Sequence, residues 1–311
     1  MAGAAMLTLA GPKWVVPAIF RDAARPVLGV MAGSAFTPVV IAAMSSWWQA
    51  LPVLLAVFLL YNFLGQLYFT RVCKFDRTTA VLASMPGGLG EMSLLAMQFN
   101  ADIRRLVLVH SIRILIVVSA VPFAVQLITG ERLVRTAVPA GMAPLMPLDW
   151  MILIGCAVFG YLLGRPFRAF AGIIMFPLIF SAIAHISGWT SVEPPGWLVA
   201  SMQVVIGCIT GSRFNGISFG QARVALIQGA LWTIFLLLFS SAVALAGASV
   251  LGMPMAVLFL ALAPGGFAEM TIISYAIGIE VAFVVTCHVF RLFYSIAAAP
   301  LLVRLATRSP P

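Results

Sequence analysis

Hydrophobic residues dominate the chain, and short polar stretches interrupt them at fairly regular intervals. Three long runs contain no Asp, Glu, Lys or Arg: residues 36–70, 169–192 and 224–268. Since a membrane-spanning helix needs about 20 apolar residues, the last run is long enough for two crossings. The whole pattern predicts about ten transmembrane helices, at roughly 26–45, 47–70, 78–98, 103–130, 148–164, 170–187, 196–212, 222–250, 254–277 and 281–306. We therefore expect an all-α polytopic membrane protein.

The composition points to the same class of protein. Hydrophobic residues make up 62% of the 311 residues, charged residues make up 9%, and the mean hydropathy is +1.10. A soluble domain of this length would precipitate with such a composition. The net charge of +9 comes from Lys and Arg clusters between apolar segments, where they orient membrane helices. We therefore expect contact with the lipid bilayer and no direct binding of nucleic acid.

The chain contains an internal duplication. The heptapeptide at 86–92, Pro-Gly-Gly-Leu-Gly-Glu-Met, returns at 264–270 as Pro-Gly-Gly-Phe-Ala-Glu-Met, an offset of 178 (264 minus 86). The same offset relates the polar residues of the flanking segments. We predict a first repeat at 1–130, a proline-rich linker at 131–147 and a second repeat at 148–311. The segments at 148–187 have no partners after Met1, so we expect the first repeat to be incomplete at its N-terminus.

Each Pro-Gly-Gly element is expected to break a helix within the bilayer. Proline removes a backbone donor and glycine permits non-helical dihedral angles. Unpaired backbone groups are tolerated at this depth only beside protein or a water-filled cavity. The predicted broken-helix backbone consists of Pro86, Gly87, Gly88, Pro264, Gly265 and Gly266. The sequence leaves open whether the two repeats cross the membrane in parallel or inverted orientation.

Two glutamates follow the predicted breaks. Glu91 and Glu269 fall in the first turn of the half-helices that begin there. One interpretation is a capping carboxylate that satisfies free backbone amides. The other is a carboxylate that takes up protons or coordinates a cation, because ionisable groups inside a membrane usually line a pathway. We favour the second, since both repeats retain Glu in a chain with nine acidic residues.

A His-x-x-Arg element follows each glutamate. His110 with Arg113, and His288 with Arg291, have the i, i+3 spacing that places both side chains on one helix face. These residues are either hydrogen-bonded within the core, or they form an anion site or an ion pair with glutamate. The ion pairs that we expect first are Glu91 with Arg113 and Glu269 with Arg291; crossed pairs between the repeats are the second choice.

The remaining polar positions suggest structural roles. Asp102 and Glu280 precede the His-x-x-Arg helices and are expected to be helix caps. Gly33-Ser34 ends an earlier segment and permits either close helix contact or a further interrupted helix. No catalytic motif is present, and three histidines and four cysteines without close spacing predict no metal site and no cofactor.

The paired elements resemble the AbrB-duplication family of bacterial inner-membrane proteins. The resemblance rests on the two Pro-Gly-Gly-x-x-Glu-Met elements, the His-x-x-Arg elements that follow, and the Gly-Ser-x-Phe elements at 33–36 and 211–214. It implies a multi-helix protein of the bacterial inner membrane. Members of this family are called AbrB-family transcriptional regulators or regulators of gene expression and, in older records, candidate ammonia monooxygenases.

These observations lead to one expected function and two alternatives. We expect a transporter-like protein, not an enzyme, that binds a small anionic solute with proton or cation coupling. The residues expected to bind solute or ion are Glu91, Glu269, His110, His288, Arg113 and Arg291. The first alternative is a membrane-embedded regulator of gene expression. The second is an oxidoreductase, which would require bound metal or haem. A homo-oligomer is compatible with all three functions.

Overall fold

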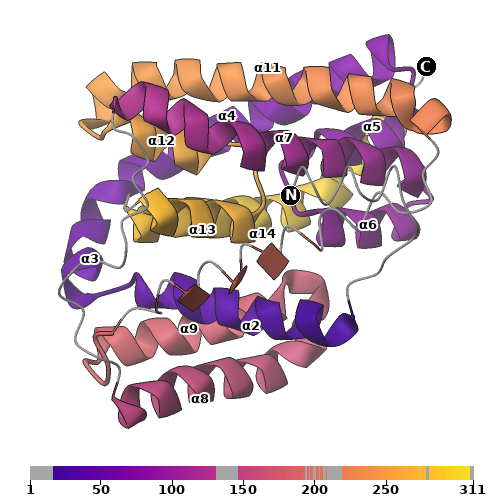
Figure 1. Ribbon diagram of the computed structural model, residues 1–311. Coiled ribbons are helices and arrows are strands. Elements are labelled where there is room, and N and C mark those ends of the chain that lie inside the picture. Colours follow the sequence, from indigo (N-terminus) through magenta and orange to yellow (C-terminus); the bar gives the residue numbers. More distant parts are fainter. Residues whose placement is uncertain are drawn as a thin grey trace.

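The computed structural model describes residues 17–130, 146–192, 219–277 and 280–308, together with 195, 197–198, 201–202, 204–205 and 208. Within this part of the chain the fold is all-α, and no strand is present (Figure 1). Five of the described helices are long and apolar enough to cross a membrane. The predicted class, an all-α polytopic protein, is confirmed. The count of about ten crossings stays a prediction.

The structure describes twelve α-helices. In chain order they are α2 (Ala18–Ser34), α3 (Pro38–Ala43), α4 (Ala50–Leu67), α5 (Arg77–Ser84), α6 (Leu89–Gln98), α7 (Ile103–Thr129), α8 (Pro147–Gly164), α9 (Gly172–Ile186), α11 (Phe219–Leu251), α12 (Met255–Leu262), α13 (Phe267–Ile277) and α14 (Val281–Arg308). Short segments of 3₁₀ or π helix extend α3, α4 and α8; they are η1 (Met44–Gln49), η2 (Tyr68–Val72) and η3 (Arg165–Phe170).

The helix starts repeat along the chain. The starting residues of α5 and α12, of α6 and α13, and of α7 and α14 all lie 178 positions apart, from 77 to 255, 89 to 267 and 103 to 281. Each broken pair, α5 with α6 and α12 with α13, replaces one continuous helix. The domain boundaries stay predictions, because residues 131–145 of the expected linker lie outside the described residues.

Helices α8, α9 and α2 lie side by side at one edge of the molecule (Figure 1). Small residues allow this close approach, as is common for helices in membranes. A Cβ atom added to Gly33 of α2 would lie 2.7 Å from the Cβ of Ser181 in α9, and Gly160 of α8 is equally close to Pro177 of α9. The structure therefore shows close helix contact at Gly33, and the helix also ends at Ser34, so both roles expected for Gly33-Ser34 are present.

The apolar segment expected at 26–45 is divided in two. Helix α2 ends at Ser34 and α3 begins at Pro38, with the Thr37 hydroxyl accepting a hydrogen bond from the Val40 amide at 3.3 Å. Proline has no amide hydrogen, so it suits the first position of a helix and not its interior. The hydrophobic run alone does not reveal this interruption.

Candidate functional site

The two Pro-Gly-Gly elements lie between pairs of short helices. Residues 85–88 separate α5 from α6, and residues 263–266 separate α12 from α13. The residues before the prolines, Met85 and Ala263, have ψ angles of 134° and are extended. A proline excludes helical dihedral angles at the residue that precedes it, so the sequence itself ends both helices. Each break therefore exposes the carbonyl end of one half-helix and the amide end of the next.

In the first repeat, α7 satisfies the carbonyl end of α5. The guanidinium of Arg113 donates from Nη1 to the Met85 carbonyl at 2.9 Å and from Nη2 to the Gly87 carbonyl at 2.7 Å. One turn earlier, His110 Nε2 lies 3.2 Å from the Leu82 carbonyl. Both side chains are buried, Arg113 with 2% of its surface exposed. The His-x-x-Arg element is thus a clamp on the end of a broken helix.

The second repeat contains the same clamp at matching positions. Arg291 donates from Nη1 to the Ala263 carbonyl at 2.6 Å and from Nη2 to the Gly265 carbonyl. His288 Nε2 lies 3.0 Å from the Leu260 carbonyl. Each of these acceptors is 178 positions from its counterpart in the first repeat. The duplication in the sequence is therefore also a duplication of side-chain to backbone geometry.

The ion pair expected between Glu269 and Arg291 is not formed, and this prediction was wrong. Among the described residues the ion pairs are Arg25 with Asp22 and Arg105 with Asp102, both near exposed helix ends. The reason is competition for the guanidinium, whose two terminal nitrogens are used by backbone carbonyls that the break leaves without helical partners. The side chain of Glu91 lies outside the described part, so its predicted pair with Arg113 stays a prediction.

The two histidines differ in one respect. A carbonyl oxygen can only accept, so Nε2 of each ring carries the proton and Nδ1 is an acceptor. Nδ1 of His110 accepts from Nη2 of Arg113 at 2.9 Å. Nδ1 of His288 is buried without a hydrogen-bond partner. The clamp of the second repeat therefore leaves one acceptor unused.

A set of polar side chains that the sequence analysis missed connects the two halves of the chain. Four of the five tyrosines form such a connection. Each makes a hydrogen bond between a residue that precedes the predicted linker at 131–147 in the sequence and a residue that follows it. Two of these contacts lie at the ends of broken helices: Asn62 also accepts from Ser84 of α5 at 3.2 Å, and Ser240 also donates to the Leu262 carbonyl of α12 at 3.3 Å. The four bonds are Tyr61–Ser240, Tyr68–Gln228 carbonyl, Tyr275–Ser34 and Tyr294–Asn62.

One signal in the sequence could have revealed part of this set. Asn62 and Ser240 are polar residues within charge-free apolar runs, and they lie 178 positions apart. Both residues are uncharged, so the pair stands out less than the repeated glutamates and arginines. The tyrosines themselves give no such signal, because Tyr61 corresponds to Phe239 and Tyr294 corresponds to Ile116.

The two expected helix caps occupy the ends at which they were placed. Asp102 is the N-cap of α7, and its carboxylate accepts from the Arg105 amide at 3.0 Å. Glu280 is exposed and directly precedes α14, where its carbonyl accepts from the Val284 amide at 3.2 Å. Both residues lie away from the breaks.

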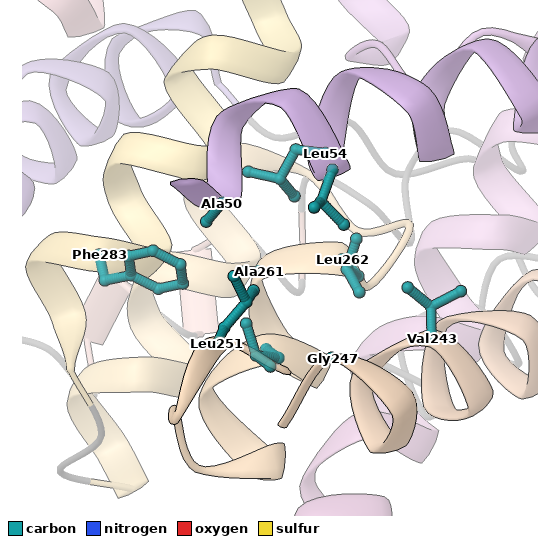
Figure 2. Close-up of a pocket in the computed structure, with 10 residues that line it drawn as sticks. Ala50, Leu54, Val243, Gly247, Leu251, Ala261, Leu262 and Phe283 are labelled. Carbon is teal, nitrogen blue, oxygen red and sulfur yellow. The ribbon is translucent and has the colours of Figure 1, made fainter. Parts of the chain in front are cut away.

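An apolar crevice lies beside the last turn of α12, between α4, α11, α12 and α14 (Figure 2). Its walls include Leu54, Gly247, Leu262 and Phe283, and all ten lining residues are apolar or glycine. None of the predicted site residues lines it. Within the described residues, no three His, Cys, Asp or Glu side chains are grouped in a way that could hold a metal ion.

Comparison with known proteins places the chain in a family. It is 28% identical to "Uncharacterized protein YhjN" of Bacillus subtilis (strain 168) over 296 residues, which covers 90% of this chain and 76% of the relative. It is 23% identical to "Putative regulator AbrB" of Escherichia coli (strain K12) over 289 residues, 93% of this chain and 83% of the relative. No solved structure gives a significant match. Because the family described as "Transition state regulatory protein AbrB" matches residues 1–307, the chain belongs to the AbrB family.

Proposed function

We propose that this membrane protein is a secondary-transporter-like protein of the bacterial inner membrane, not an enzyme, and that it binds a small anionic solute beside its two broken helices. The observation that carries the proposal is the pair of buried arginines, Arg113 and Arg291, each bound to the carbonyl end of a broken helix. Burying a charged group in a membrane is costly, and residues that do so commonly mark the path of an ion or substrate.

The arrangement favours an anion over a cation. The guanidiniums cover the carbonyl ends of α5 and α12, which are the negative ends of those helices. The amide ends of α6 and α13, which are positive, begin at the same two breaks. A carboxylate or similar group is the chemistry that a helix N-terminus attracts, and interrupted helices in duplicated transporters use it in this way. Glu91 and Glu269 supply groups for proton or cation coupling.

Proton flux in proteoliposomes tests this proposal. Purified protein is reconstituted with an internal pH dye, and a panel of cations and small organic anions is added to wild type, Glu91→Gln and Glu269→Gln. We expect a solute-dependent pH signal in wild type that both substitutions remove. Monodisperse, folded wild-type protein that gives no signal with any member of the panel would overturn the proposal.

A membrane-embedded regulator of gene expression is the second candidate. It is favoured by the name of the Escherichia coli relative, which is that of a regulator. The two candidates differ in what a transport-defective variant does in the cell. A regulator that acts through a protein partner keeps its effect on transcript levels when Glu269→Gln removes proton flux, whereas a transporter that acts through solute levels loses it.

A further inference from the structure

The carboxylate of Glu269 is turned toward the start of its own helix. Glu269 is the third residue of α13 and is half-buried. A Cβ atom added to Gly266, the residue before α13, would collide with Glu269 Oε2 and lie 2.9 Å from its carboxyl carbon. The carboxylate therefore lies over the amide end of α13, the position that a bound anion would take.

The charge of Glu269 also acts on both clamps. It interacts electrostatically with Arg113 and with Arg291, and the charge of Arg291 acts on Arg113 as well. Helices α14, α7 and α2 pack against α13. Their other titratable or charged side chains near the breaks are Cys287, His288 and Tyr294 on α14 and His110 on α7. The pair Asp22 with Arg25 lies on the exposed start of α2.

A proton on Glu269 changes the balance of charge at the breaks. Among the described residues there, two guanidiniums are opposed by this one carboxylate, and the sequence adds Glu91 at the matching position of α6. Protonation of Glu269 raises the net charge by one, which is unfavourable within a membrane. A monovalent anion restores the original balance. Proton and anion binding therefore favour each other, by the same factor in both directions.

We infer that Glu269 is the coupling group and that it takes up one proton for each anionic charge bound, so that loading the site is electroneutral. This inference rests on the transport function proposed above. The carboxylate and the anion have the same sign and are attracted to the same helix end. Neutralising Glu269 thus removes a competitor as well as a counter-charge, and both effects favour the anion.

The test measures uptake of radiolabelled lactate, pyruvate and gluconate into proteoliposomes in which valinomycin and a K⁺ gradient set the membrane potential. In wild type we expect uptake that does not respond to the potential, with an apparent affinity that rises up to about tenfold per unit fall in pH, the limit for one linked proton. In Glu269→Gln we expect uptake of the same anion that is independent of pH and is driven by an inside-positive potential.

Glu280→Gln is the matched control, because it removes the same charge from an exposed residue two positions before Ala282, the first buried residue of α14. It should keep the pH dependence and the electroneutrality of wild type. Wild-type uptake that follows the potential overturns the inference even if Glu269→Gln fails to fold. Unchanged pH dependence in Glu269→Gln also overturns the inference and leaves transport intact. No uptake of any of these anions, with no pH signal from the wider panel, overturns the proposed function itself.

Discussion

Arg113 and Arg291 each supply two donors to carbonyl groups that a helix break leaves without helical partners. A buried polar group without a hydrogen bond costs about 1–3 kcal/mol. Two such groups at each break cost enough to offset much of the penalty for burying a guanidinium. The planar fork of arginine spans both carbonyls, which the single ammonium of lysine does not. These residues therefore hold the breaks in place, whatever they contribute to ligand binding.

Removing one clamp should destabilise the protein by a measurable amount. We expect Arg291→Met to lower the free energy of unfolding by about 2–4 kcal/mol, because two buried carbonyls lose their donors. Arg291→Lys should give a smaller loss, since lysine can still reach one of them. Denaturant unfolding in detergent measures both, with Arg304→Met, an exposed change on the same helix, as control. Equal stability of Arg291→Met and Arg304→Met would contradict this account.

The tyrosine hydrogen bonds should each contribute less to stability than an arginine clamp, and each should couple only the two residues that form it. The Tyr294 hydroxyl accepts from Asn62 Nδ2 at 2.9 Å, in a partly buried position between the two halves of the chain. A double-mutant cycle of Tyr294→Phe and Asn62→Ala should give a coupling energy of about 0.5–1.5 kcal/mol, the net value of a neutral hydrogen bond. Tyr161→Phe, whose ring lies beside Arg165, should show no coupling to Asn62→Ala. Strict additivity in the first cycle would mean that the bond contributes nothing.

At the scale of helices, the sequence predicts where a helix is interrupted better than it predicts which groups its side chains contact. Proline and glycine end a helix through local sterics, so both Pro-Gly-Gly breaks could be placed from the residues alone. The acceptors of Arg113 and Arg291 could not, because a backbone carbonyl has no residue identity for a pattern to detect. The same limit applies to α2, whose contact with α9 depends on Gly33 meeting backbone that lies about 145 positions further along the chain.

Glycines on α2 and α8 allow a test of this helix packing with opposite expected signs. A Cβ on Gly33 would meet the Leu178 carbonyl and lie 2.7 Å from Ser181 Cβ, whereas a Cβ on Gly155 of α8 meets nothing within 4 Å. Gly33→Ala should therefore separate α2 from α9 and lower the unfolding temperature. Gly155→Ala should be neutral or stabilise the protein by up to about 1 kcal/mol, the difference in helix propensity. Equal effects of the two substitutions would rule out this packing.

At the scale of the whole molecule, an apolar helix is not always a helix that is exposed to lipid. Helix α12 consists entirely of apolar residues, yet Ala256–Leu262 are all buried in the protein. In α8 and α11, only 17% of the most apolar stretch is buried. Helix α12 thus lies within the protein, packed against α7, α11 and α14. This follows from chemistry, since irregular backbone is tolerated inside a membrane only where protein or water covers it.

A carbene-generating probe dissolved in the lipid tails distinguishes these two kinds of apolar helix. In proteoliposomes we expect heavy labelling of exposed side chains on α8 and α11, such as Phe159 and Leu238, which are 65% and 67% exposed. Peptides from α12 should stay near background except at Leu258, Ala261 and Leu262, which line the apolar crevice. Protein unfolded in dodecyl sulfate is the control, since every apolar helix should then be labelled. Labelling of α12 in the native protein at the level of α11 would place the broken helices at the lipid surface. Their backbone would then lack the cover that both the clamps and the proposed anion site require.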